Sequence, residues 1–203
     1  MLKRTHTCGE LRSSHANETV TLAGWVNTYR DHSKGLVFID LRDRYGLTQV
    51  VFDLEDVPPD VVELAQGLRR EYVIAVSGTV RSRDGGTNSK LATGEIEVIA
   101  QKLEILNKSE TPPILPDDHE AEKISEEVRL RNRFIDLRRP RMQAILALRS
   151  RITNLTRAFF HGQSFLEVET PLLIKSTPEG ARDYVVPSRL EAGSWYALPQ
   201  SPQ

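Results

Sequence analysis

The sequence has few of the features on which secreted and membrane-bound proteins depend. Cys8 is the only cysteine in 203 residues, which excludes an intramolecular disulfide and fits a reducing compartment. No apolar stretch approaches the ~20 residues that a bilayer-spanning helix needs. The basic start MLKRTHTCGELRSS is not followed by the apolar segment that a secretory signal requires. We therefore predict a cytoplasmic protein that is not attached to a membrane.

Motifs for metal and nucleotide binding are also missing. The sequence contains no internal repeat and no Gly-rich phosphate loop. The five histidines are scattered along the chain and lack the spacing of metal ligands: His6, His15, His32, His119 and His161. The sequence therefore predicts no metal site.

The charge balance is nearly even, with a formal net charge of −1. This value argues against a protein that binds nucleic acid through bulk charge alone, but it leaves room for a local basic patch. The content of 39% hydrophobic and 27% charged residues is typical of globular domains.

Residues 1–106 have the pattern of short strands. In GLVFIDLRD, Val37, Ile39 and Leu41 share one parity, which predicts that one face of this strand is buried. A short helix is expected at residues 57–70, where proline stands near the start of a run with helical apolar spacing. Five strands with a helix after the third favour a closed all-β barrel of the OB type. A meandering sandwich is the alternative.

Residues 107–125 are predicted to form a linker, because they contain three prolines and five acids against two lysines. From residue 126 the pattern becomes helical, with a long amphipathic helix expected to stop near Gly162. FLEVET, at residues 165–170, alternates like a strand. Residues 126–160 hold nine arginines against three acids, which fits either a solvated helix face or an RNA-facing or interface surface.

The parity of residues 35–43 also predicts a working surface on the barrel. If Val37 and Ile39 point inward, Phe38 points outward, and Gln49 does so on the next strand. On an OB-fold this face is where bases stack on aromatic side chains, and Arg30 and Lys34 would add positive charge beside it. The alternative is that Phe38 packs under a neighbouring loop.

Several segments resemble one family, the bacterial-type aspartyl-tRNA synthetases of class II. CGELRSSHANETVTLAGWVNTYRDH and VFIDLRDRYGLTQVVFD resemble its N-terminal anticodon-binding domain. RFIDLRRPRMQ, FLEVETP, STPEGARDYVVPSR and YALPQSPQ resemble the beginning of its α+β catalytic domain. FLEVETP alone is shared with lysyl enzymes, whereas the last two segments are specific to the aspartyl type. The resemblance runs from about residue 6 to the last residue. It predicts an anticodon-binding domain over 1–106 and an incomplete catalytic domain over 126–203.

The resemblance assigns roles to individual residues of the barrel. Arg30, Phe38, Gln49 and Glu95 fall on anticodon-contacting positions. His32 and Gly86 resemble the residues of forms that charge tRNA-Asn as well as tRNA-Asp.

Further roles follow for the second part of the chain. Glu179 is expected to contact the ammonium group of L-aspartate from a loop that closes over it, and Ser201 and Gln203 fall on the aspartate pocket. Pro171 ends the strand that, with the long helix, forms the homodimer interface of the family. An intramolecular core stripe is the alternative for that helix.

The family activates aspartate with ATP and Mg²⁺ and transfers it to tRNA. The arginines and carboxylates for that chemistry belong to motifs that the 203 residues do not contain, so no catalytic residue is assigned. We therefore expect an N-terminal fragment of an aspartate–tRNA ligase, able to bind an anticodon and inactive alone. The alternative is a stand-alone tRNA-binding or synthetase-interacting protein.

Overall fold

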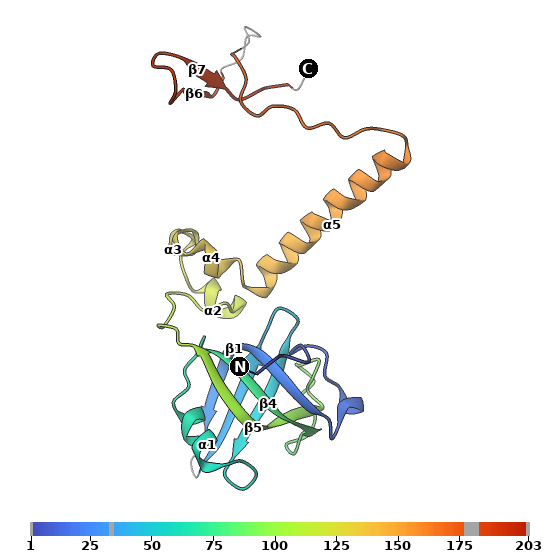
Figure 1. The fold of residues 1–203 in the computed structure, drawn as a ribbon, viewed down its shortest axis with the longest axis vertical. Helices are drawn as coiled ribbons and strands as arrows, with labels where there is room; N and C mark the ends of the chain where they lie inside the picture. Colours follow the sequence, from blue (N-terminus) through green and yellow to red (C-terminus); the bar gives the residue numbers. More distant parts are fainter. Residues whose placement is uncertain (1, 33–34, 177–182, 202–203) are drawn as a thin grey trace. The chain divides into compact units, whose positions relative to one another are not determined.

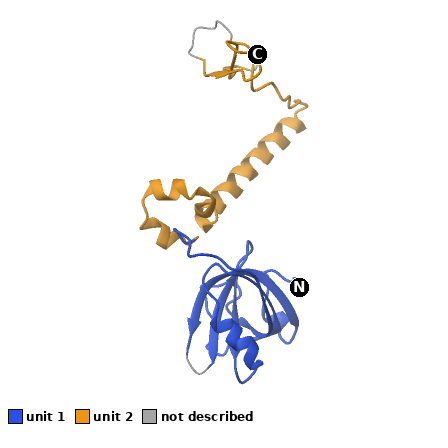
Figure 2. Cartoon of the chain, turned by 60° about the vertical axis from the view of Figure 1, so that its left-hand side comes forward, with its two compact units in different colours: residues 1–115 blue, residues 116–203 orange. Residues whose placement is uncertain are grey.

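The chain divides into two compact units, residues 1–115 and residues 116–203 (Figure 2). The computed structural model describes residues 2–32, 35–176 and 183–201. Lys34, Glu179 and Gln203, to which the sequence assigned roles, lie outside the described residues. Among the described residues, no helix combines the length and apolar character needed to cross a bilayer.

The first unit is a closed five-stranded barrel in the order β1-β2-β3-β5-β4 (Figure 1). The β3–β5 pair is parallel, and the other four pairs are antiparallel. This arrangement confirms the predicted OB-type barrel and excludes the sandwich. The strands are β1 (Thr19–Asp31), β2 (Leu36–Arg42), β3 (Leu47–Asp53), β4 (Val73–Ser82) and β5 (Ile96–Asn107).

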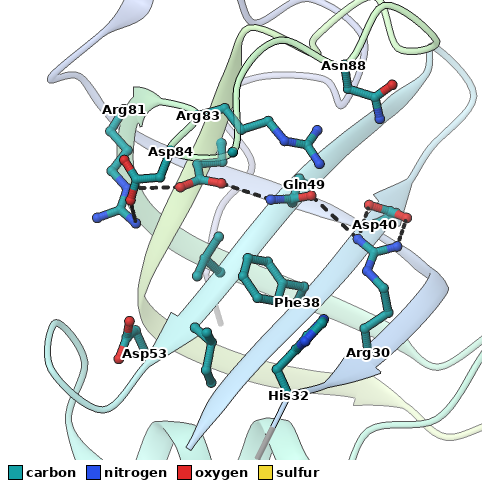
Figure 3. A pocket seen from close by; sticks show the side chains of 14 residues that line it. Arg30, His32, Phe38, Asp40, Gln49, Asp53, Arg81, Arg83, Asp84 and Asn88 are labelled. Atoms are coloured by element: carbon teal, nitrogen blue, oxygen red, sulfur yellow. Dashed lines mark hydrogen bonds and ion pairs between the residues drawn. The ribbon is translucent and has the colours of Figure 1, made fainter.

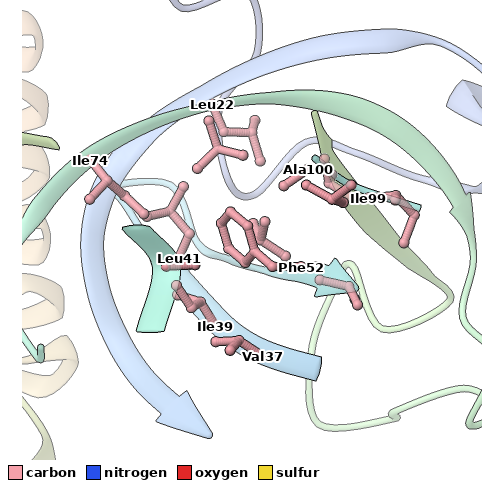
Figure 4. Close-up of a cluster of buried hydrophobic side chains, with 14 of the residues drawn as sticks. Leu22, Val37, Ile39, Leu41, Phe52, Ile74, Ile99 and Ala100 are labelled. Atoms are coloured by element: carbon pink, nitrogen blue, oxygen red, sulfur yellow. The ribbon is translucent and has the colours of Figure 1, made fainter. Parts of the chain in front are cut away.

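The interior of the barrel is filled by the side chains that the parity assigned to it. Val37, Ile39 and Leu41 of β2 are fully buried, and Phe52 of β3 is the largest fully buried side chain (Figure 4). Cys8 is also buried, as expected, and desolvation raises the pKa of its thiol. All residues of this hydrophobic core belong to the first unit.

Two short helices belong to this unit. The helix α1 (Pro59–Gln66) begins with proline in its first turn and contributes Val62 and Ala65 to the core, so the helix predicted over residues 57–70 forms over a shorter stretch. The 3₁₀ helix η1 (Ser13–His15) precedes β1.

The second unit has little core. Within the predicted linker, residues 118–122 form the helix α2 (Asp118–Glu122), so three nearby prolines do not prevent regular structure there. The remaining elements are α3 (Glu126–Arg131), α4 (Arg133–Asp136), α5 (Pro140–Gly162), β6 (Val185–Pro187) and β7 (Trp195–Ala197). Arg139 is buried and binds Asp136 and Asp118 at 2.7 and 2.8 Å, so at least one of the nine arginines is structural.

The long helix α5 ends at Gly162, as predicted, and a local hydrogen-bond pattern closes it. Ser164, with φ of +66°, takes the left-handed position, and its N–H donates to His161 O. The Phe165 N–H donates to Phe160 O, and the two rings touch. These are the bonds of a Schellman cap, in which Ser164 takes the left-handed position two residues after Gly162, the last residue of the helix.

The structure excludes one alternative and corrects one expectation for the second unit. The apolar stripe of α5 is exposed, with Ile145 49% and Leu155 65% accessible, so within the described residues it is not an intramolecular core stripe. Residues 165–170 form no strand. A strand exists only through hydrogen bonds to a neighbour, and the sheet described in this unit contains only β6 and β7.

We predict that Gly78→Ala destabilises the barrel by roughly 1–3 kcal/mol. Gly78 lies at an irregularity in the β4–β5 register, where a Cβ would overlap the backbone oxygen of Ile99. Gly85→Ala is the matched control, because a Cβ there meets nothing within 4 Å. Urea unfolding of the two variants measures the difference, and equal stabilities would contradict the proposed steric cause.

Candidate nucleic-acid interface

A hollow of about 560 Å³ lies on the outside of the barrel, over β2 and β3 and beside the loop that joins β4 to β5 (Figure 3). Four of the sequence-predicted residues line it: Arg30, His32, Phe38 and Gln49. The strand register explains why they meet. Arg30 of β1 is paired with Phe38 of β2, and Asp40 of β2 is paired with Gln49 of β3. Side chains that point away from the core on neighbouring strands therefore form one surface.

Phe38 provides the aromatic wall of this hollow. Its side chain is partly exposed, and the ring of His32 meets it edge to face at 5.2 Å between centroids. The inner edge of Phe38 packs against the core, which fixes the ring while one part of it stays accessible. A rigid, partly exposed aromatic ring between polar side chains is a suitable platform for a flat ligand.

Polar side chains form one continuous network along the hollow (Figure 3). Arg30 donates two hydrogen bonds to Asp40, at 2.8 and 3.0 Å, and a longer one to Gln49 Oε1 at 3.5 Å. Gln49 Nε2 donates to Glu97 Oε2 at 2.8 Å, and Arg81 Nε donates to Glu97 Oε1 at 3.0 Å. Gln49 lines the hollow but is almost fully buried, with 3% of its surface accessible, and this network uses only one of its two amide hydrogens.

The carboxylates of the network raise the pKa of the two arginines that they bind. The hydrogen bonds of Asp40 raise the pKa of Arg30, although burial of the guanidinium acts in the opposite direction. Burial acts to lower the pKa of Arg81, but the hydrogen bond and charge of Glu97 outweigh it and raise the pKa. Both guanidinium groups are therefore held charged and in fixed orientations.

Arg83 differs from these arginines because its Nη1 atom is buried and donates no hydrogen bond among the described residues. Figure 3 shows its guanidinium reaching into the hollow above Gln49. A buried donor without an acceptor costs roughly 1–3 kcal/mol. An acceptor atom on a bound ligand would remove that cost, so Arg83 is a candidate ligand-binding residue.

Sequence reasoning missed Arg81, Arg83 and Glu97. The segment VRSR contained a usable signal, since its arginines are two residues apart at the end of a strand and share one parity. Glu97 could not be identified in this way. Its position beside Arg81 depends on how β5 pairs with β4, and local sequence patterns do not show that pairing.

The other predicted residues of the barrel lie outside the lining of the hollow. Glu95 is exposed and accepts a hydrogen bond from Ser13 Oγ at 2.9 Å. Gly86 has φ of +79°, with open space around it. It belongs to the same loop as Gly85 and Asn88, which do line the hollow.

Two predicted residues of the second unit are described. Ser201 and Pro171 are both exposed. Because Glu179 and Gln203 are outside the described residues, the structure does not bring the predicted aspartate-contacting residues together.

The comparisons with known proteins match both units. Residues 20–106 match the family described as "OB-fold nucleic acid binding domain", and residues 125–203 match "tRNA synthetases class II (D, K and N)". The whole chain is 54% identical to an aspartate–tRNA(Asp/Asn) ligase of Desulfatibacillum aliphaticivorans, covering 33% of that protein. It is 56% identical, over 98% of its length, to the enzyme of the same name from Salinibacter ruber, covering 32% of it.

Among solved structures, one match is the asparaginyl-tRNA synthetase of Pyrococcus horikoshii complexed with asparaginyl-adenylate. The TM-score is 0.81 and the identity 26%, and the match covers 100% of this chain and 44% of the other. The chain thus spans about a third of the length of the curated relatives it matches.

We predict that Glu97→Ala destabilises the barrel, because it leaves Arg81 Nε and Gln49 Nε2 without their acceptor. The expected loss is roughly 1–3 kcal/mol. Glu95→Ala, two residues away and exposed, should change stability by less than about 0.5 kcal/mol. Urea unfolding compares the two, and a loss that is no larger for Glu97→Ala would contradict the role given to this carboxylate.

Proposed function

Since the chain is homologous along its whole length to aspartate–tRNA ligases, we propose that its barrel binds the anticodon of a tRNA in the hollow beside Phe38. The accessible face of Phe38, held between Arg30, Gln49 and His32, is the observation that carries this proposal. Unpaired anticodon bases have exposed aromatic faces and can stack on such a ring, which contributes ~1–3 kcal/mol per base.

The polar groups around Phe38 would read the edges of the bound bases. Gln49 offers both a donor and an acceptor, held in place by Glu97 and Arg30. Arg83 Nη1 offers a donor that has no hydrogen-bond partner among the described residues. We assign Glu95 to the rim of the same interface, beside η1, where it is exposed to solvent.

Both tRNA-Asp and tRNA-Asn are proposed ligands, as the names of the relatives suggest. The two anticodons differ in one base under the genetic code. His32 touches the edge of Phe38, and Gly86 lies in the loop above the hollow. A small residue at Gly86 leaves open space there, which fits tolerance of more than one base.

The whole reaction is proposed to be the ATP-dependent aspartylation of tRNA, of which this chain supplies the anticodon-binding part. Glu179, Ser201 and Gln203 would contact L-aspartate. The exposed stripe of α5 and the segment ending at Pro171 would join two subunits in a homodimer, which is a suitable role for unburied apolar side chains. Cytoplasmic location follows from the same proposal.

Mg²⁺ in ATP-using sites is usually held by one or two carboxylates together with the substrate phosphates. We assign no residue of 116–203 to this role. The remaining two thirds of the relatives' length has no counterpart in these 203 residues. In the relatives, we assign the groups that handle ATP and Mg²⁺ to the part that these 203 residues do not match.

The anticodon proposal predicts that Phe38→Ala weakens binding of the tRNA-Asp and tRNA-Asn anticodon stem-loops by about fivefold to 150-fold, the equivalent of one stacked base. Fluorescence anisotropy with labelled stem-loops measures both affinities. Phe134→Ala, which removes an exposed ring from α4, should leave them unchanged. Equal affinities for wild type and Phe38→Ala would contradict the proposed stacking.

A second prediction concerns catalysis. Residues 1–203 alone should give no aspartate-dependent ATP–pyrophosphate exchange, because the groups assigned to ATP and Mg²⁺ are absent from them. A full-length relative serves as the positive control. Exchange above background would place the activation chemistry within this chain and contradict the assignment.

A further inference from the structure

Two histidines and a glutamate come together on the barrel at a place separate from the hollow. His6 lies in the arm before η1, His15 is the last residue of η1, and Glu18 directly precedes β1. One potential ligand atom from each lies within 4.8 Å of the other two. The rings of His6 and His15 are 5.7 Å apart and nearly perpendicular. None of the three residues lines the hollow.

The backbone holds all three positions. The N–H groups of Thr5 and His6 both donate to Thr21 O, at 2.9 and 3.4 Å, which ties the arm to β1. The Glu18 N–H donates to His15 O at 3.0 Å, and Glu18 O accepts from the Val80 N–H of β4 at 3.0 Å. Ligand positions fixed in this way lose little conformational freedom when an ion binds.

The turn that brings His15 and Glu18 together depends on Asn17. Asn17 has φ of +71°, a left-handed conformation that asparagine tolerates, and its N–H donates to Val80 O at 2.8 Å. The Glu18 carboxylate makes no hydrogen bond or ion pair with another described residue. It is therefore available as a ligand.

Neighbouring groups orient both imidazole rings through their Nδ1 atoms. His6 Nδ1 is 2.9 Å from Thr5 Oγ1. His15 Nδ1 accepts from the Arg12 N–H at 3.0 Å and lies 3.3 Å from Arg12 O. An ion at His15 Nε2 requires the ring proton on Nδ1, so binding would replace the hydrogen bond from the Arg12 N–H with one from Nδ1 to Arg12 O. Such a bond from the other ring nitrogen is the usual support of a metal-bound histidine.

The ligand types favour zinc. Two imidazole nitrogens and one carboxylate form a common three-residue zinc set that leaves the fourth position to water. Glu10 adds a nearby negative charge: its pKa is lowered chiefly by the Thr7 hydroxyl, with smaller contributions from His6 and His15. Both histidines are partly exposed, which gives an ion access from solvent.

We propose that His6, His15 and Glu18 bind a Zn²⁺ ion that fastens the N-terminal arm to the start of β1. The site stands independently of the anticodon proposal, because it shares no residue with the hollow.

Isothermal titration of the chelator-treated 203-residue chain with Zn²⁺ alone tests the site. We expect one Zn²⁺ per chain, bound at least about tenfold more weakly by His6→Ala and by His15→Ala. His161→Ala removes an imidazole from α5 and should bind as the wild type does. Thermal unfolding should show a Zn²⁺-dependent rise in Tm for wild type that is lost in the double variant His6→Ala/His15→Ala.

Glu18→Gln keeps both histidines and changes an exposed side chain, so it provides a variant whose fold is preserved. It should bind Zn²⁺ more weakly with an unchanged circular dichroism spectrum. Wild-type affinity and stoichiometry in Glu18→Gln and in the double variant would overturn the proposal. So would a wild-type chain that binds no Zn²⁺ at millimolar concentration.

Discussion

The path of β1 around the barrel determines where Arg30 meets the other polar residues of the hollow. Its first half pairs with β4 and its second half with β2, so one strand of 13 residues must bend between two neighbours. The register shifts between Val26 and Thr28, and such a bulge increases bend and twist. At Gly24 the backbone of β1 approaches Arg42 so closely that a side chain would not fit. After this bend Arg30 lies beside Phe38.

Because one face of each strand is buried in the barrel, the residues that alternate with the buried ones must lie on the outer face. Once Val37 and Ile39 fill the barrel, Phe38 and Asp40 must face outward. Asp40 and Glu97 each bind an arginine, and this pairing keeps the guanidinium groups from turning into solvent. Arg30 and Arg81 are held in fixed orientations by their carboxylates. Nη1 of Arg83, in contrast, has no hydrogen-bond partner among the described residues. A nearly neutral protein can in this way hold a local surface suited to nucleic acid.

Local patterns in the sequence predicted those parts of the structure that depend on neighbouring residues. The parity of β2 was sufficient to place Phe38 outside and Val37 inside. Features that need distant pairing were not predictable. Glu97 reaches Gln49 only because β5 pairs with both β3 and β4. FLEVET has strand periodicity, but periodicity does not supply a partner strand. His6 and His15 showed no metal-ligand spacing, and the hydrogen bonds of the arm to β1 and of η1 bring them together.

The two units differ in how far their apolar side chains are buried, and this difference bears on what each unit can do alone. The barrel buries its apolar residues within 115 residues, so its outer surface has a defined shape without any partner. In the second unit, Leu148, Ile152 and Phe159 of α5 are 55–63% exposed. Burial of such a stripe would contribute about 25 cal/mol for each Å² removed from water. The proposed anticodon binding accordingly needs only the barrel, whereas the proposed role of α5 in a homodimer needs a second surface to cover its stripe.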